Sequence, residues 1–385
     1  MRSAIVGGGI AGLALAVELS RLGCDATVVE ARYPGAGNST RNVGRIRRMQ
    51  LTEDLTEFAC RAAEKWERVD RITGGRNPLL YPTSYVWAMY TEQELRIVEP
   101  LQAMWKAFDA RARVVDREDV LAAVPVLRGG EPTVGGVIGN AAIVHHDAAL
   151  YAYYLFAREA GVRFELGAQA TGVVLDGDRA VGVELADGRT VAADVVVNAT
   201  GGMAGEFAAT CGVDAPNRPL RREVLVTEPM RPFMTPAVTF YHPQEGWFNQ
   251  TLRGELVAGV VDVDEPLGMN ESSSPAFLAR TARVVLAKAP RLAALRVVRQ
   301  WGGVYDTTPD KRPLVGEYPE RPGLFALNGW SGRGMLLAPL AAELLARELT
   351  GRGRDRLLDP FDPGRFVGAR PIVTTTGDYY SGYAH

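Results

Sequence analysis

The first thirty residues alternate between short apolar runs and one longer stretch of helical period. Residues 4–6 and 26–29 are apolar runs that predict buried strands. Residues 10–22, which lie between them, carry small and apolar side chains at helical spacing and predict a helix. The order strand, helix, strand is that of a βαβ unit with two parallel strands.

Two more helices are expected before residue 165. Thr52 can cap a helix whose apolar positions recur every three or four residues through residues 55–66. Asp147 is expected to cap a helix that Gly161 closes. Residues 162–166 then alternate between apolar and polar, so a second βαβ-like unit is expected to begin here.

The period changes in the second half of the chain. The Asp187-Gly188 pair predicts a hairpin turn, and residues 195–197 predict a buried strand that ends in small residues. Residues 221–262 contain the runs EVLVTE, AVTFY, WFNQ and ELVAGVVD, which predict an antiparallel sheet and a second domain. Residues 336–349 predict a helix with one apolar side.

Composition and charge exclude several classes of protein. The 385 residues are enough for two or three domains, and the hydrophobic and charged fractions are those of folded globular proteins. With 43 basic and 45 acidic residues, the formal charge of −2 creates no field that would attract nucleic acid or an anionic membrane. We therefore expect neither partner.

The remaining sequence signals favour a cytoplasmic protein. The three cysteines, at positions 24, 60 and 211, have no metal-binding or redox spacing, which favours a reducing compartment. No apolar stretch reaches the length needed to span a bilayer, and the first residues leave no room for an export signal.

A dinucleotide fingerprint follows the first predicted strand. It occupies the turn and the helix start at Gly7, Gly9, Ile10, Ala11 and Gly12. Free backbone N–H groups and the positive helix end can hold a pyrophosphate there. Glu30 ends the second strand, where its carboxylate can accept hydrogen bonds from both hydroxyls of an adenosine ribose and would repel a 2′-phosphate. NADP is therefore disfavoured at this site.

The fingerprint by itself leaves NAD and FAD open, because it reads only the ADP moiety that both share. The glycine clusters at residues 135–139 and 201–205 lack the spacing of a second fingerprint. Flavoproteins with a separate NADPH domain are therefore disfavoured.

A group of longer motifs carries a resemblance to a known family. The motifs are GGGIAGL, TRNVGRIRRMQ, VVVNATGG, WGGVYDTTPDKRPLVG (301–316) and GLFALNGWSGRGMLLAP (323–339). Over residues 1–365 the chain resembles the amino-acid oxidase superfamily of FAD enzymes, which includes glycine oxidase and sarcosine oxidase. The motifs RNVGRIR, HHDAAL, LVTEP and GELVAGVVD are most similar to the β subunits of heterotetrameric sarcosine oxidase and their amino-acid dehydrogenase relatives.

The resemblance implies an α/β fold of two domains and an arm. A Rossmann-like FAD-binding domain of the glutathione-reductase type would comprise residues 1–80, 145–212 and 300–360. An inserted substrate domain of antiparallel sheet and helices would comprise residues 81–144 and 213–299. Residues 361–385 would form a carboxy-terminal arm.

The resemblance also implies the contacts of the flavin. The Gly332-Arg333-Gly334 turn would direct backbone N–H groups at flavin N1 and the C2 carbonyl, where negative charge develops on reduction. Further residues implied beside the cofactor are Ala31, Arg32, Arg41, Asn42, Val43, Thr200, Gly201, Gly303 and Met335.

A dense arginine cluster marks the expected substrate side. Four arginines fall within residues 41–48, interleaved with apolar residues, which indicates an anion nearby. The resemblance implies that Arg45 and Arg48 bind the substrate carboxylate, with Arg333 as a further candidate. Tyr241 and His242 are candidates to line the substrate cavity, and a packing or surface role is equally open for them.

Three positions differ from monomeric sarcosine oxidases, and a fourth matches a residue of tetrameric relatives. Gly303 stands where monomeric sarcosine oxidases have their flavin-linking cysteine, so FAD is expected to bind without a covalent bond. Leu336 replaces their second carboxylate-binding lysine. Val257 replaces their oxygen-activating lysine, which favours a dehydrogenase or a partner-assisted oxidase. His146 matches a histidine near which tetrameric relatives hold FMN, so FMN is an alternative second cofactor.

These observations support two hypotheses about function. The first is an FAD-dependent enzyme that oxidises the C–N bond of an amino acid or N-alkyl amine by hydride transfer to flavin N5, giving an imine. Its electron acceptor would be O2 or another molecule. The second is a flavoprotein subunit of a homo- or hetero-oligomer that needs a partner chain. A flavin monooxygenase is a third and weaker reading.

Overall fold

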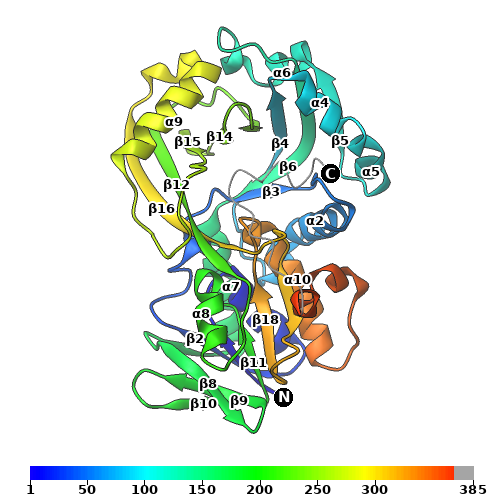
Figure 1. Cartoon of the computed structure of the whole chain (residues 1–385), viewed down its shortest axis with the longest axis vertical. Helices are drawn as coiled ribbons and strands as arrows, with labels where there is room; N and C mark the ends of the chain where they lie inside the picture. The colour runs from blue at the N-terminus through cyan, green and yellow to red at the C-terminus, as the bar shows by residue number, and fades with distance from the viewer. Residues whose placement is uncertain (368–385) are drawn as a thin grey trace.

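The computed structural model describes residues 1–367 and contains two units, which Figure 1 shows one above the other. The lower unit is built on a six-stranded sheet in the order β17-β18-β11-β1-β2-β7. All neighbouring pairs in it are parallel except β17 with β18. The strands are β1 (Arg2–Val6), β2 (Asp25–Glu30), β7 (Arg163–Leu166), β11 (Val195–Asn198), β17 (Leu314–Glu317) and β18 (Leu324–Asn328).

The core of this lower unit surrounds helix α1 (Ile10–Arg21), whose residues 10–19 are all buried. Such an all-round apolar helix needs partners on several sides. It packs against α10 (Gly334–Leu349) and α7 (His146–Glu159), while α10 also packs against α2 (Glu53–Trp66). The predicted βαβ opening and these predicted helices are confirmed.

The two predictions of helix N-cap residues have different outcomes. Thr52 is the N-cap residue of α2, although its side chain makes no capping hydrogen bond. The prediction that Asp147 caps α7 is wrong, because the helix begins one residue earlier and His145 is the N-cap. His145 Nδ1 accepts a hydrogen bond from the Ala148 backbone N–H at 3.5 Å. Asp147 instead lies in the first turn, where a carboxylate interacts favourably with the helix dipole.

The upper unit is a nine-stranded sheet in the order β16-β12-β15-β14-β13-β4-β6-β3, with β5 paired to β6. Neighbouring strands are antiparallel apart from β13 with β4. The strands are β3 (Arg45–Arg47), β4 (Leu80–Met89), β5 (Ala112–Asp116), β6 (Gly135–Val144), β12 (Arg218–Pro229), β13 (Ala237–Phe240), β14 (Gly246–Gln250), β15 (Glu255–Val260) and β16 (Val297–Thr307).

Short helices cover the outside of this large sheet. In Figure 1, α9 lies beside β15 and β12, and α4 to α6 lie on the opposite side beside β4 to β6. The remaining helices of the described chain are α3 (Val69–Ile72), α4 (Glu92–Val98), α5 (Leu101–Ala107), α6 (Arg117–Ala123), α8 (Ala204–Ala209) and α9 (Pro275–Lys288). The mixed α/β fold agrees with the expected fold class.

A three-stranded sheet completes the lower unit. It has the order β10-β9-β8, with β8 (Ala170–Asp176), β9 (Arg179–Leu185) and β10 (Thr190–Ala192). The hairpin turn predicted at Asp187-Gly188 joins β9 to β10, and Gly188 adopts a left-handed φ of 85° there.

Three segments depart from the expected domain boundaries. Residues 45–47 form β3, which pairs with β6 of the large sheet. Residues 300–307 belong to β16, which pairs with β12 in the same sheet. Phe361 is fully buried and meets the Phe58 ring edge-on at 5.1 Å, so the arm begins by packing on α2. The rest of the expected arm, residues 368–385, lies outside the described residues.

Two findings concern the whole described chain. No helix within residues 1–367 combines the length and apolar character that crossing a bilayer requires. Cys24, Cys60 and Cys211 are all free thiols.

Candidate active site

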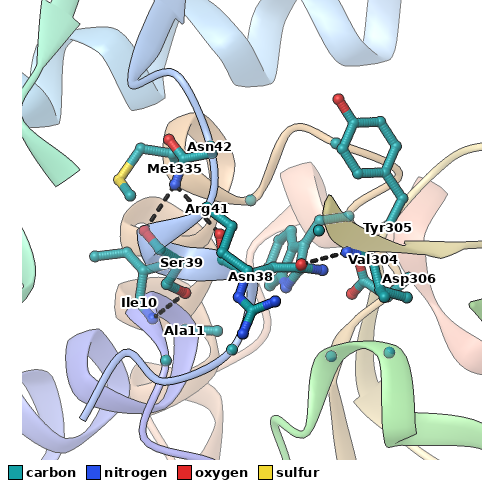
Figure 2. Close-up of a pocket in the computed structure, with 18 of the residues that line it drawn as sticks. Ile10, Ala11, Asn38, Ser39, Arg41, Asn42, Val304, Tyr305, Asp306 and Met335 are labelled. Atoms are coloured by element: carbon teal, nitrogen blue, oxygen red, sulfur yellow. Dashed lines mark hydrogen bonds between the residues drawn. The ribbon is translucent and has the colours of Figure 1, made fainter. Parts of the chain in front are cut away.

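One cavity of about 850 Å³ extends from the amino end of α1 to the face of the nine-stranded sheet. Both units contribute to its walls. Every expected cofactor-binding residue lines it except Gly12. Figure 2 shows part of the cavity, in which residues of the 38–42 segment lie between the start of α1 and residues 304–306 of β16.

The glycine turn at the lower end needs its glycines for two different reasons. Gly7 adopts a left-handed φ of 110°, and a Cβ there would lie 2.4 Å from the Ala199 carbonyl oxygen. A Cβ at Gly12 would lie 1.9 Å from the Gly7 carbonyl oxygen. Gly12 does not line the cavity, so its role as a direct cofactor contact is corrected: it allows α1 to pack closely on β1.

The amino end of α1 fits a phosphate group. Gly9 is the N-cap and has no capping side chain, and Ile10 donates its backbone N–H to Ser39 Oγ at 3.0 Å (Figure 2). The N–H groups of a first helical turn have no partner within the helix. Apart from the Ile10 N–H, which Ser39 accepts, the turn therefore presents its remaining donors and a positive dipole end to the cavity.

Glu30 fits the ribose that would follow. Its Oε2 accepts the Gly8 N–H at 2.8 Å, and its Oε1 accepts the Arg32 N–H at 2.9 Å. These bonds orient the carboxylate and leave lone pairs on both oxygens for two hydroxyl donors. A Cβ at Gly8 would lie 3.1 Å from the Glu30 side chain, so a larger residue there would require Glu30 to shift by a few tenths of an ångström.

Residues 38–42 connect β16 to the lower unit through hydrogen bonds. Asn38 Oδ1 accepts the Val304 backbone N–H, as Figure 2 shows. The Arg41 guanidinium donates to the Gly302 carbonyl at 3.1 Å, and the Arg41 backbone carbonyl accepts the Trp301 indole N–H at 3.1 Å. A Cβ at Gly303 would stand 3.0 Å from Asn38 Oδ1. No cysteine or histidine is among the residues of the described chain that line the cavity.

A second helix terminus faces the cavity at its middle. Helix α10 begins at Gly334 after a turn in which Gly332 has a φ of 85°. A Cβ at Gly332 would lie 2.4 Å from the Tyr305 ring. This turn and helix start, which include Arg333 and Met335, fit the pyrimidine end of a flavin ring because that end gains negative charge.

Asp306 stabilises the turn before α10 through hydrogen bonds. Its Oδ2 accepts the Gly329 N–H at 2.8 Å, and its backbone carbonyl accepts the Ser331 N–H at 3.2 Å. Burial raises the pKa of Asp306 to about 7, although nearby backbone donors oppose the shift. Sequence reasoning missed Asp306, since its position in the sequence shows no reason for burial.

Arg45 lies on the sheet side of the cavity. Its Nε and Nη2 donate to Asn249 Oδ1 at 3.0 and 2.8 Å, and its Nη1 lies 3.3 Å from Thr239 Oγ1. The guanidinium stacks over the Trp247 ring at 4.7 Å. Burial lowers the pKa of Arg45, and the neighbouring Arg47 charge lowers it further.

The expectation for Arg48 is corrected. Side chains alternate along a strand, so Arg45 and Arg47 of β3 share the cavity face while the next residue does not. Arg48 is 5% exposed, outside the cavity, and donates to Glu67 at 2.6 Å and to the Cys60 carbonyl at 3.4 Å. Applying the period of two to RIRR would have selected Arg47.

Of the other expected substrate-side residues, some line the cavity and some do not. Arg333, Tyr241 and Leu336 line the cavity. His242 is exposed and does not line it, which corrects its candidacy. Val257 also lies outside the lining, although Val260 and Val261 of the same segment are part of it. The position of Val257 therefore does not support the inference that its replacement of a lysine slows the reaction with oxygen.

His146, the residue associated with an FMN alternative, is not part of this cavity. Its ring lies 5.5 Å from that of His145 at the start of α7. Burial lowers the pKa of His146, against the opposing effect of Asp147. His146 is therefore a half-buried residue at the start of α7.

Arg222 and Glu245 are further charged residues of the cavity that were not found from the sequence. Glu245 precedes β14, and Arg222 lies on β12 with its guanidinium 5.6 Å from the Tyr305 ring. Burial raises the pKa of Glu245, while the charges of Arg222, Arg47, Lys311 and Arg333 act in the opposite direction. Neither belongs to a local motif, because the sheet brings them together from distant strands.

The fold and this cavity define a flavin-dependent oxidoreductase, and comparison with known proteins agrees. The DAO family, described as FAD dependent oxidoreductase, matches residues 2–348. The chain therefore belongs to the DAO family of FAD-dependent oxidoreductases. This finding confirms the resemblance inferred from the motifs, and with it FAD as the cofactor.

Individual relatives are distant but extend over nearly the whole chain. Sarcosine oxidase subunit beta of Rhodobacter capsulatus is 24% identical over 373 residues, covering 94% of this chain and 89% of the relative. Glycine oxidase of Pseudomonas putida is 26% identical, covering 92% and 96%. Among solved structures, L-proline dehydrogenase from P. horikoshii superposes with a TM-score of 0.89 at 25% identity, covering 95% of this chain and 98% of that one.

Proposed function

We propose that the protein oxidises the C–N bond of an amino acid or N-alkyl amino acid and releases an imine. The substrate would bind between the start of α10 and the nine-stranded sheet, with its carboxylate on Arg45. The kinds of substrate in the names of the relatives, sarcosine, glycine and proline, support this class. FAD would be held without a covalent bond, since no cysteine or histidine of the described chain lines the cavity.

The surroundings of Arg45 are the observation that carries the proposal. The half-buried guanidinium lies in the cavity wall and is hydrogen-bonded to Asn249, Thr239 and Tyr85, none of which is a carboxylate. A cation partly removed from water and without a carboxylate partner is costly unless an anion completes it. A substrate carboxylate can supply that charge through two parallel hydrogen bonds.

The residues of this chain bind, orient and exclude water. Bound FAD supplies an acceptor for two electrons and a proton, which leave the substrate carbon together as hydride. Arg45 would fix the carboxylate, so that the adjacent C–H bond meets the acceptor in one orientation. The amine nitrogen loses a proton before or during this transfer, and water then hydrolyses the imine to a carbonyl compound and an amine. O2 or another oxidant would take the electrons onward.

A direct test is anaerobic mixing of the purified holoenzyme with amino acids and N-methyl amino acids. The proposal expects at least one of them to bleach the visible flavin absorbance in a single turnover. Retention of full absorbance with every amine in the panel would contradict it. NADPH is a useful addition to the panel, because bleaching by NADPH would favour a monooxygenase.

A partner chain is a second proposal, supported by the naming of three relatives as β subunits of sarcosine oxidase. Coexpression with genes adjacent to the one for this chain, followed by affinity purification, should recover a stoichiometric second chain. A monodisperse single subunit that turns over its amine rapidly with oxygen would contradict this proposal.

The free cysteines support our placing the protein in the reducing cytoplasm.

A further inference from the structure

The sheet end of the cavity holds more positive than negative charge. Its cations are the guanidinium groups of Arg45, Arg47, Arg222 and Arg333. Three carboxyl groups, those of Glu223, Glu245 and Asp306, also line this part of the cavity. How these carboxyl groups are used decides how much of the positive charge is balanced.

Two of the three carboxyl groups are engaged elsewhere. Glu223 Oε1 accepts the Ser273 hydroxyl at 2.9 Å and the Ser274 N–H at 2.8 Å, and Glu223 also neighbours Arg221. Asp306 is turned toward the backbone at Gly329. Glu245 is therefore the carboxylate that balances the arginines of the cavity.

Arg45 and Arg222 approach the cavity from different strands. Arg45 crosses from β3 to Asn249 of β14, whereas Arg222 projects from β12 over Tyr305 of β16. Within residues 1–367, no ion pair joins either guanidinium to a carboxylate. The Arg222 guanidinium donates to the Arg221 carbonyl at 3.0 Å, which is again a neutral partner.

We propose that the substrate is an amine with two carboxylates, one held by Arg45 and the second by Arg222. This inference rests on the proposed function and narrows its substrate class. The amine nitrogen would lie toward Glu245, the third of the carboxyl groups at this end of the cavity. With a single substrate carboxylate, the four guanidinium groups would still outnumber the negative charges that face them, at a cost in desolvation.

The position of Tyr305 places the second carboxylate beside the redox centre. The Tyr305 ring rests on Gly332, in the turn before α10, and Arg222 stacks over that ring. The Arg222 anion site therefore lies beside the turn where the flavin ring is expected. The second carboxylate can be carried either on the side chain of an α-amino acid or on the substituent of the amine nitrogen.

Binding of unreactive carboxylates to the holoenzyme tests this directly. Glutarate and butyrate have similar apolar length and differ by one carboxylate, and each dissociation constant is measured from the change in the flavin spectrum. We expect glutarate to bind at least tenfold more tightly than butyrate. Equal affinities in the wild-type protein would overturn the proposal, whatever the variants do.

Variants locate the second carboxylate. Arg222→Met should reduce the glutarate-to-butyrate preference to within about threefold and leave butyrate binding nearly unchanged. Arg299→Met is the matched control, because Arg299 is exposed on β16, stacks on Trp301 at 5.7 Å and does not line the cavity. An unchanged preference in Arg222→Met, or an equal loss in both variants, would overturn the role of Arg222.

Oxidation assays separate this inference from the proposed function. Glutamate is compared with α-aminobutyrate, and N-(carboxymethyl)alanine with N-ethylalanine, by the rate of anaerobic flavin bleaching. Faster bleaching by the dicarboxylate of either pair supports the inference and shows where the second carboxylate is carried. Equal bleaching within both pairs would keep the amine oxidase and refute the dicarboxylate. Bleaching by no amine would refute the proposed function, while the binding test would still stand.

Discussion

Arg45 and Arg48 differ by only three positions in the chain, yet the strand turns them to opposite environments. Arg45 meets the cavity and the polar groups of its wall, whereas Arg48 meets Glu67 and Glu64 outside it. A charge-assisted hydrogen bond contributes about 1.5–3 kcal/mol. The functional cost of removing each arginine should therefore differ sharply, although the substitution is chemically identical.

We expect Arg45→Met to lower kcat/KM for a carboxylate-bearing amine by about 10- to 100-fold, the factor that such a bond represents. Arg48→Met should lower the melting temperature, because Glu67 loses its partner, while kcat/KM stays within about threefold of wild type. Steady-state kinetics and thermal melting of both holoenzymes check this. The reverse pattern would show that Arg48 is the carboxylate ligand.

Gly332 tests the turn against which the flavin ring is expected. In Gly332→Ala the new methyl group would meet the Tyr305 ring at 2.4 Å, in addition to the strain of a φ of 85°. Gly351→Ala is the matched control, because Gly351 has a φ of 72° with no atom near its Cβ position. We expect the first variant to retain less than half of its FAD after gel filtration and the second to retain all of it. Equal flavin-to-protein absorbance ratios would contradict this.

At the scale of elements, Asp306 joins the end of β16 to the turn that precedes α10. Its pKa is raised by burial to about 7, so the folded protein binds this proton more tightly than the unfolded chain does. Stability contributed by the neutral form is therefore present below the ordinary aspartate pKa and is lost as the pH rises toward 7. Below that window both states are protonated, and above it both are ionised.

Asp306→Asn should remove this pH dependence. Between pH 4.5 and 8 the wild-type holoenzyme is expected to lose about 3 kcal/mol of unfolding free energy through this group, and the variant should lose correspondingly less. Urea unfolding at several pH values measures the slopes. Asp178→Asn, an exposed substitution, should keep the wild-type slope. Parallel pH profiles for wild type and Asp306→Asn would refute the assignment.

Elements with a strong local period were predictable, and those defined by distant pairing were not. Helix α1 and strands β1 and β2 follow from apolar spacing and a glycine turn within thirty residues. Strand β3 has three residues, too few for a period to be recognised, so its alternation of Arg45 and Arg47 was missed. Strand β16 joins the large sheet through a partner some eighty residues earlier in the chain, which no local pattern reveals.

The same distinction divides the candidate site. The glycine turn, Glu30 and the turn before α10 each form part of a contiguous motif and were found as such. Arg222 and Glu245 enter the cavity from separate strands and loops, and their significance lies in the shared charge balance. A charge balance is a property of the folded cavity, so it becomes visible only after the strands are placed.

For the whole molecule, the cavity couples the two units because each supplies part of its wall. The lower unit provides the turn of α1 and Glu30, and the upper unit provides Arg45 and Tyr305. The 38–42 segment and β16 connect them through Asn38 and Arg41. A ligand that occupies the full length of this cavity stabilises both units, by an amount that grows with its concentration over its dissociation constant.

Removing FAD should therefore loosen the upper sheet as well as the lower one. We expect the apoprotein to melt at a lower temperature and FAD at 1,000 times its dissociation constant to restore about 4 kcal/mol. Hydrogen exchange should slow on FAD addition in β1 and the start of α1, and equally in β3 and the cavity end of β16. ADP, which can occupy only the lower end, is the control and should protect the first pair of segments alone. Identical protection by ADP and FAD would contradict a cofactor that bridges the units, because the contacts of the flavin ring would then add nothing to the upper sheet.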